Sequence, residues 1–273
     1  MTKKRQALSK DWLISHHHAK EGIRIQMIND LPLKDSSYVL DAGCGTGNFA
    51  DIFLQRTKLI DKILCVDKDI DNLEAARKIL QGKKNFEKVF WLHDEIENLT
   101  FIKEFDIVWC ANTLQYFDDP VSMIQKLMSM TKKGGLVAIK DEDVMRDIML
   151  SWDPEFELAM LNAWYKIATN IEGDFWDPFI GRKLLGLMQK SGLKDINIKN
   201  YLVEYSYPLP ESAVSYIHNA FVNYSKEYKD LLSDKNWRIF SQTFDLTSSD
   251  YLFNREDFHF VGIETLVTAV VSD

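Results

Sequence analysis

Short runs of β-branched and apolar residues alternate with stretches of helical periodicity along the first half of the chain. The predicted strands are residues 38–41, 63–67, 88–92, 105–110 and 136–140. The predicted helices between them are residues 48–55, 70–80 and 121–130. Asp119 and Pro120 predict the start of the last helix, and the Lys-Lys-Gly-Gly segment at 132–135 predicts its end. Strands that alternate with helices are typical of βαβ units and a parallel sheet.

After residue 140 the pattern becomes rich in aromatic, methionine and acidic residues. The pattern predicts one or two helices over residues 141–178, a crossover helix over residues 182–190 that ends at Gly192, and further helices over residues 211–250. It also predicts two more strands, at residues 196–207 and 258–271. The expected fold is α/β, a doubly wound, seven-stranded, mostly parallel sheet. We expect one domain over residues 1–273, with its core at about 30–140, 180–207 and 258–273. Helical insertions at about 141–179 and 208–257 would form a cap over the carboxyl ends of the strands.

Composition narrows the class of protein. Of the 273 residues 46% are hydrophobic and 27% charged, which excludes a disordered chain. Lys and Arg number 33 against 41 Asp and Glu, a balance that argues against binding nucleic acid through its phosphates. The three cysteines have no C-x-x-C spacing, so we expect neither a disulfide framework nor a metal site. Without an apolar leader or membrane-length apolar run, a cytoplasmic location is expected.

The most informative segment, residues 39–50, combines the end of the first strand, a glycine-rich turn and a helix start. Gly43, Gly45 and Gly47 permit a tight turn and close approach of a ligand to the backbone. Their N–H groups and the helix N-terminus offer hydrogen-bond donors. Asp41, just before the turn, is placed to face a cationic or amine-bearing ligand. The alternative is a strand-to-helix turn that binds nothing.

Acidic residues also follow the next two predicted strands. Asp67 ends the second strand, the position that accepts hydrogen bonds from a ribose diol in Rossmann-type sites. Asp94 and Glu95 follow the third strand. A single acid at such a place is usually a solvated loop residue. Acids at three successive strand ends, in register with the glycine turn, predict a shared ligand site.

Taken together, these motifs resemble class I S-adenosylmethionine (SAM) dependent methyltransferases, in particular those that act on small molecules such as quinone precursors. Residues 40–50 resemble the first motif of that family, Asp67 its ribose-binding acid, and Asp94 and Glu95 the segment that holds the adenine amino group. Residues 105–112 resemble the fourth strand, and residues 113–119 the turn beyond it. Residues 127–139 resemble the following helix, Gly-Gly turn and fifth strand. The resemblance is strong over residues 37–140 and weak over the remaining strands.

The resemblance implies SAM as cofactor, S-adenosylhomocysteine (SAH) as product, and methyl transfer to oxygen, nitrogen or carbon of a small apolar or aromatic acceptor. The cofactor-binding residues it implies are Asp41, Gly43, Cys44, Gly45, Gly47, Asp67, Lys68, Asp94, Glu95, Asn112, Gln115 and His18. His18 is included because an N-terminal helix often folds over the cofactor in such enzymes.

Other activities remain as alternatives. A dinucleotide enzyme would use G-x-G-x-x-G, whereas this turn is G-x-G-x-G, and the ammonium of SAM explains an acid at Asp41. The segment Asn112-Thr113-Leu114-Gln115 departs from the Asn/Asp-Pro-Pro-aromatic motif of enzymes that methylate base amines or glutamine. A SAM-binding scaffold without catalysis stays open. So does an RNA methyltransferase, which would need a basic groove such as Lys83, Lys84 and Lys88.

Methyl transfer from a sulfonium needs mainly alignment of the nucleophile, and a base only when the acceptor must lose a proton. The candidate bases are His218, whose ordinary pKa lies near neutrality, and Asp141 and Glu142 after the fifth strand. The candidate acceptor-binding residues are Tyr116, Arg146, Trp152, Trp176 and Tyr216. A role in the core or at the surface is the alternative for each of them.

Overall fold

The computed structural model describes residues 10–56, 58–143, 145, 147–170 and 175–272. The chain divides into two compact units, which are described one at a time. The sheet unit comprises Gly22–Asp143, Phe175–Tyr201 and Glu264–Asp273, and the helical unit comprises Met1–Glu21, Val144–Asp174 and Leu202–Ile263. Among the described residues no helix is both long enough and apolar enough to cross a membrane.

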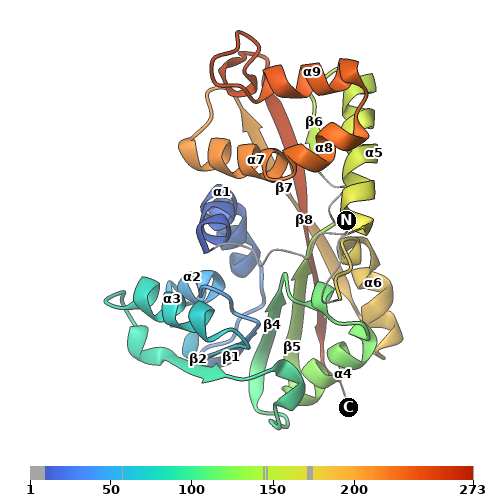
Figure 1. The fold of residues 1–273 in the computed structure, drawn as a ribbon. Coiled ribbons are helices and arrows are strands. Elements are labelled where there is room, and N and C mark those ends of the chain that lie inside the picture. The colour runs from blue at the N-terminus through green and yellow to red at the C-terminus, as the bar shows by residue number, and fades with distance from the viewer. Residues whose placement is uncertain (1–9, 57, 144, 146, 171–174, 273) are drawn as a thin grey trace. The chain divides into compact units, whose positions relative to one another are not determined.

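A mixed β-sheet forms the centre of the sheet unit (Figure 1). Its strands are β1 (Ser37–Ala42), β2 (Ile60–Asp67), β3 (Val89–His93), β4 (Phe105–Ala111), β5 (Thr131–Asp141), β7 (Asn197–Ser206) and β8 (His259–Val270). The order is β3-β2-β1-β4-β5-β8, with β7 also paired to β8. Strands β1 to β5 are parallel, and β8 returns antiparallel to β5 with Lys140 opposite Leu266. The predicted seven-stranded, mostly parallel sheet is confirmed, and the structure adds a two-residue strand, β6 (Ile148–Met149), in the helical unit.

Helices cover both faces of this sheet, which is why its strands are apolar on both sides. Helices α2 (Asn48–Leu54) and α3 (Ile70–Leu80) pack on one face with residues 22–29 of α1 (Lys10–Asn29). Helices α4 (Pro120–Met130) and α6 (Ile180–Lys190) pack on the other. Successive residues of β1 alternate between the two cores, with Val39 in the first and Leu40 in the second.

Side-chain caps mark the starts of α3 and α4 in the sheet unit. Asp69 precedes α3 and its side chain accepts a hydrogen bond from Asp71 N at 2.8 Å. Asp119 caps α4 in the same way, with Pro120 in the first turn, as predicted. The predicted helix of residues 121–130 ends where α4 does, at Met130, but the role given to residues 132–135 is wrong, because they belong to β5 and do not form a last turn and glycine stop. Lys132 therefore pairs with Asp106 at 2.9 Å across the sheet instead of lying in a last helical turn.

Short helices dominate the helical unit. They are residues 10–21 of α1, α5 (Pro154–Thr169), α7 (Glu211–Val222), α8 (Ser225–Leu231) and α9 (Asp234–Thr243). Strand β6 pairs antiparallel with β8, Ile148 opposite Val261. Within residues 141–178 the described part thus holds one helix and this short strand. The helical prediction for residues 211–250 extends too far, because α9 ends at Thr243. That this unit caps the strand ends stays a prediction.

Candidate functional site

The glycine turn joins the carboxyl end of β1 to α2, and its backbone is left-handed at each glycine, with φ of 74° at Gly43, 54° at Gly45 and 76° at Gly47. A Cβ on Gly43 would lie 2.4 Å from Thr113 Oγ1, and one on Gly47 would lie 3.0 Å from Ala76 Cβ. A Cβ on Gly45 would meet no atom within 4 Å. Gly43 and Gly47 are therefore needed for packing against the protein itself, whereas Gly45 borders open space.

Asp41 is buried beneath this turn, with 1% of its surface exposed. Its Oδ2 atom is buried and has no hydrogen-bond partner among the described residues. Burial, together with the nearby carboxylate of Asp67, raises the pKa of Asp41 to about 7. A buried carboxylate with an unused oxygen is suited to a cationic ligand group, because a positive charge would offset the cost of its burial.

Asp67 connects the turn to the end of β2. Its carboxylate accepts hydrogen bonds from Gly45 N at 2.7 Å, Asp69 N at 2.9 Å and Asn72 Nδ2 at 3.3 Å. The side chain is thereby fixed at the carboxyl edge of the sheet. Cys44 N, in the turn, also donates to Val66 O of β2 at 2.9 Å. The structure thus brings the predicted residues of the first two strands together.

The ends of β2 and β3 are also joined. His93 Nε2 lies 3.1 Å from the carbonyl oxygen of Lys68. Asp94 accepts hydrogen bonds from Asn98 Nδ2 at 3.0 Å and from Glu95 N at 2.8 Å, and these hold the pKa of its carboxyl below the usual range. Lys68 and Glu95 themselves are exposed. Asp94 is therefore an ionised acceptor in a fixed orientation near the end of β3.

Beyond β4 lies the 3₁₀ turn Leu114–Tyr116, which carries Gln115 and Tyr116. Asp141 holds this turn: its Oδ2 accepts from Gln115 N at 3.1 Å and its Oδ1 from Glu142 N at 2.9 Å. Burial raises the pKa of Asp141 to about 7, although these hydrogen bonds oppose the shift. Because both oxygens of Asp141 are engaged with the backbone, this geometry favours a structural role over that of a base.

Trp176 is anchored to the same turn. Its Nε1 donates to Gln115 Oε1 at 2.6 Å, and Asp177 N donates to Gln115 O at 2.8 Å. Gln115 Nε2 in turn donates to Asn112 O at 3.0 Å. Three of the residues predicted for cofactor or acceptor, Asn112, Gln115 and Trp176, are thus linked by hydrogen bonds.

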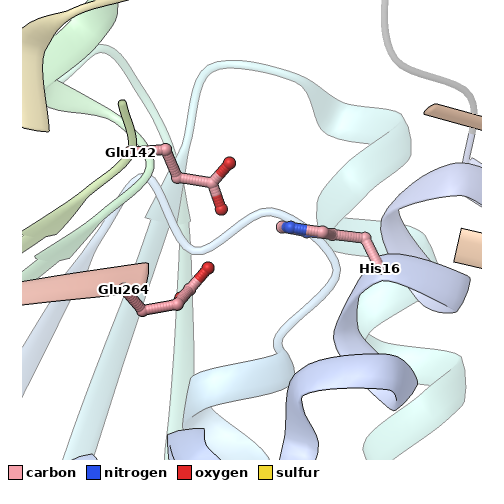
Figure 2. A group of neighbouring side chains, drawn as sticks. All are labelled: His16, Glu142 and Glu264. Carbon is pink, nitrogen blue, oxygen red and sulfur yellow. The ribbon is translucent and has the colours of Figure 1, made fainter. Parts of the chain in front are cut away.

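A buried charged group at the end of β5 was missed by the sequence prediction. Lys140 and Glu264 are both fully buried. Lys140 Nζ lies 2.6 Å from Glu264 Oε2, 3.0 Å from Glu142 Oε1 and 2.6 Å from Asn112 Oδ1. Figure 2 shows the carboxylates of Glu142 and Glu264 pointing toward one another; His16, also labelled there, belongs to the helical unit. The only sequence signal was a charged residue inside each of two apolar strands.

The other predicted residues lie in the helical unit. Trp152 and His218 both pack on Phe244, with ring centroids 6.4 and 6.0 Å away, and burial lowers the pKa of His218. Tyr216 donates to Asp147 Oδ2 at 3.3 Å. His18 Nδ1 lies 4.0 Å from Glu21. Arg146 lies outside the described residues. The cofactor, base and acceptor roles of these residues stay predictions.

A cavity of about 330 Å³ lies at the opposite end of the strands, and its lining includes Leu136 of β5 and Val270, the last residue of β8. The ion pair of Asp30 with Lys199, 2.6 Å long, lies in its wall. None of the residues predicted for cofactor or acceptor lines this cavity.

Comparison with known proteins agrees with this geometry. Residues 39–135 match the model of a methyltransferase domain. Trans-aconitate 2-methyltransferase of Rhizobium etli is 26% identical over 136 residues, which cover 48% of this chain and 50% of that protein. Malonyl-acyl-carrier-protein O-methyltransferase of Haemophilus ducreyi is 30% identical over 122 residues, covering 44% of this chain and 47% of that protein. The chain therefore spans about half the length of these curated relatives.

Solved structures show the same fold over nearly the whole chain. The YcgJ protein of Bacillus subtilis superposes with a TM-score of 0.58 at 19% sequence identity, covering 94% of this chain and 100% of that one. The matched domain spans β1 to the start of β5 and includes the glycine turn, Asp67, Asp94 and Asn112. On this evidence residues 39–135 match a methyltransferase domain, and the chain has the fold of the YcgJ protein.

Proposed function

We propose that the protein transfers a methyl group from SAM to a small organic acceptor. The observation that carries this proposal is the buried carboxylate of Asp41, with an unused oxygen, beneath a glycine turn that borders open space at Gly45. A methionyl ammonium would supply the missing positive charge. A nucleotide phosphate would be repelled by the same carboxylate.

The side chains at the strand ends fit the rest of the cofactor. Asp67 retains lone pairs beyond the hydrogen bonds it accepts from the backbone, so it can also accept from ribose hydroxyls. Asp94 is an ionised acceptor suited to the adenine amino group. The turn residues Gly43 to Gly47 would pass beside the methionyl part. The cofactor-binding residues named from the sequence are therefore retained in the proposal, His18 among them as a prediction.

When bound, the cofactor supplies a methyl group already activated by a sulfonium. The protein has to orient the acceptor in line with that methyl group and exclude water, which can contribute about 7–11 kcal/mol to lowering the barrier. Trp176 and Tyr116 of the sheet unit adjoin Gln115, and Glu142 accepts from the same Lys140 ammonium as Asn112. We assign the acceptor to this end of β4 and β5. Glu142 is the base in this unit for an acceptor that must lose a proton.

The named relatives suggest which acceptor to try first. Trans-aconitate and a malonyl group are both acids, and they are the acceptors in the names of the two relatives. A carboxylate is ionised at neutral pH, so its methylation would need no base. We therefore propose a small organic acid as the first acceptor class to test.

Isothermal titration with SAM and SAH tests cofactor binding. We expect both to bind with micromolar dissociation constants, and Asp67→Ala to weaken binding at least tenfold because the ribose acceptor is lost. Asp61→Ala is the matched control, since Asp61 is an exposed acid at the other end of the same strand. Absence of binding by both ligands to the wild-type protein would contradict the proposal, as would equal binding by Asp67→Ala.

Gly45→Ala separates cofactor exclusion from backbone strain. A side chain at either Gly45 or Gly82 must adopt a positive φ, 54° or 82°, and neither added Cβ would touch the protein. We expect each alanine to cost about 1 kcal/mol of stability. Only Gly45→Ala should abolish SAM binding, because its Cβ would point into the space assigned to the cofactor. Equal SAM affinities of the two variants would place the cofactor elsewhere.

The RNA alternative would need a basic groove at Lys83, Lys84 and Lys88, and two of these lysines already have partners within the protein. Lys83 pairs with Asp51 at 2.5 Å, and Lys88 Nζ donates to Ile60 O at 2.6 Å. Each ammonium would therefore have to share itself between this partner and a phosphate. The scaffold alternative is decided by transfer of a labelled methyl group from SAM to a pool of small carboxylic acids and to a cell extract. Binding without any transfer would favour the scaffold.

A further inference from the structure

Asn112 lies where the proposed cofactor and acceptor regions meet. It follows β4 directly, and the next residue, Thr113, contacts the glycine turn through a hydrogen bond from Oγ1 to Gly43 O at 3.3 Å. Its backbone is left-handed, with φ of 52°, a conformation that Asn and Asp tolerate better than other side chains. A residue at this place is kept in one conformation only if its neighbours hold it there.

Lys140 holds Asn112 in two ways. Asn112 N donates to Lys140 O at 2.8 Å, and Lys140 Nζ donates to Asn112 Oδ1 at 2.6 Å. Gln115 Nε2 donates to the Asn112 carbonyl at 3.0 Å. The ammonium is itself fixed, because it is fully buried and paired with Glu264 and Glu142. The Asn112 side chain therefore has little freedom to rotate.

This arrangement determines which end of the amide faces away from Lys140. An ammonium only donates hydrogen bonds, so the amide must turn its oxygen toward Nζ and its nitrogen away. The Nδ2 group has no partner among the described residues, and Asn112 is only half-buried. Two N–H donors in a fixed orientation are thus presented at the carboxyl ends of β4 and β5.

We propose that Asn112 Nδ2 is a specificity-determining donor to a carboxylate oxygen of a bound ligand, and that Lys140 is the positioning residue that orients it. This inference rests on the proposed function. The carboxylate has two sources, the methionyl carboxylate of the cofactor and the carboxylate of an acid acceptor. An amide hydrogen-bonded to an ammonium through its oxygen is polarised, which makes its N–H groups better donors.

Asn112→Asp isolates the outward-facing atom. Aspartate keeps an oxygen for Lys140 and tolerates the left-handed backbone, so the fold is retained, but the outward donor becomes a negatively charged acceptor. Asn85→Asp is the matched control, since Asn85 is also half-buried and left-handed, with φ of 67°, at a turn before β3. Thermal unfolding should show both variants folded.

The experiment compares SAH with 5′-methylthioadenosine, which lacks the methionyl carboxylate, and measures methyl transfer to a pool of di- and tricarboxylic acids. If the cofactor is the source, Asn112→Asp weakens SAH binding at least tenfold and leaves methylthioadenosine binding unchanged. If the acceptor is the source, both ligands bind normally and the KM for the acid rises at least tenfold. Either result supports the inference, and Asn85→Asp should match the wild type throughout.

SAH affinity and acid methylation both within twofold of the wild type would overturn the inference. If the wild type methylates no acid in the pool, the comparison of SAH affinity between the wild type and Asn112→Asp decides alone whether the inference holds. The two proposals fail in different ways. A wild-type protein that binds neither SAM nor SAH contradicts the proposed function. Normal SAH binding by both the wild type and Asn112→Asp, together with unchanged methylation of the acids, contradicts only the role of Asn112.

Discussion

Asp41→Asn is expected to stabilise the ligand-free protein and, at the same time, to weaken its binding of SAM. The carboxyl group of Asp41 is buried and its pKa is raised to about 7, so keeping it ionised in the folded state costs free energy. An amide of the same shape avoids that cost. We expect a gain in the free energy of unfolding on the order of 2–4 kcal/mol at pH 8.

The pH dependence has a definite sign. The unfolded state ionises Asp41 near its ordinary pKa of 3.8, whereas the folded state keeps the proton until about pH 7. The stability of the wild type relative to Asp41→Asn should therefore fall as pH rises from about 4 to 7 and stay constant above 7. Below pH 4 the difference in stability between the two proteins should again be constant. Urea unfolding at a series of pH values measures this difference.

The affinity of the wild type for SAM should rise with pH over the range in which its relative stability falls. An ionised Asp41 would pair with the methionyl ammonium, so wild-type affinity should rise about tenfold per pH unit toward pH 7 and then level off. Asp41→Asn should bind SAM at least tenfold more weakly than the wild type at pH 8. Its affinity should lack the pH dependence that comes from Asp41. Other groups with a raised pKa, Asp141 among them, are shared by both proteins and cancel in the comparison.

Asp106→Asn is the matched control because the same substitution should have the opposite effect on stability. Burial raises the pKa of Asp106, but hydrogen bonds from Tyr38 N and Lys132 Nζ outweigh it and lower the pKa overall. Its amide variant should therefore lose stability at pH 8 while binding SAM normally. An Asp41→Asn protein that is less stable than the wild type would contradict the interpretation of Asp41.

Short-range signals explain what could be predicted from the sequence. Apolar runs locate the strands, and a capping carboxylate followed by proline locates the start of α4, because each depends on neighbouring residues only. Asp41, Asp67 and Asp94 could be grouped because parallel strands bring their carboxyl ends to one edge of the sheet. Residues 132–135 were interpreted as the last turn and glycine stop of α4, but they belong to β5, where Gly134 N donates to Val271 O at 2.8 Å.

Long-range pairing explains what could not be predicted. The partner of Lys140 is 124 positions away at Glu264, and the two meet only because β8 returns antiparallel beside β5. The sequence shows an acidic residue within an apolar strand, but it does not show which basic residue pairs with it. The link from Trp176 to Gln115 is similar, since it depends on how the chain re-enters the sheet unit before α6.

Lys140→Met is expected to be the most destabilising single substitution among those considered. It would leave the fully buried carboxylate of Glu264 without its ammonium, and it would also remove the donor to Glu142 and Asn112. Removal of one partner of a buried ion pair costs about 3–5 kcal/mol, because the remaining charge stays buried. Chemical unfolding monitored by circular dichroism measures the loss.

The second substitution Glu264→Leu should restore at least half of that loss, since the double variant buries neither charge of the pair. Lys132→Met is the matched control on the same strand. Lys132 pairs with Asp106, but its side chain is 43% exposed, so its removal should cost no more than about 1 kcal/mol. If the double variant is no more stable than Lys140→Met alone, then Lys140 acts through its packing or through Asn112, and the charge of Glu264 contributes little.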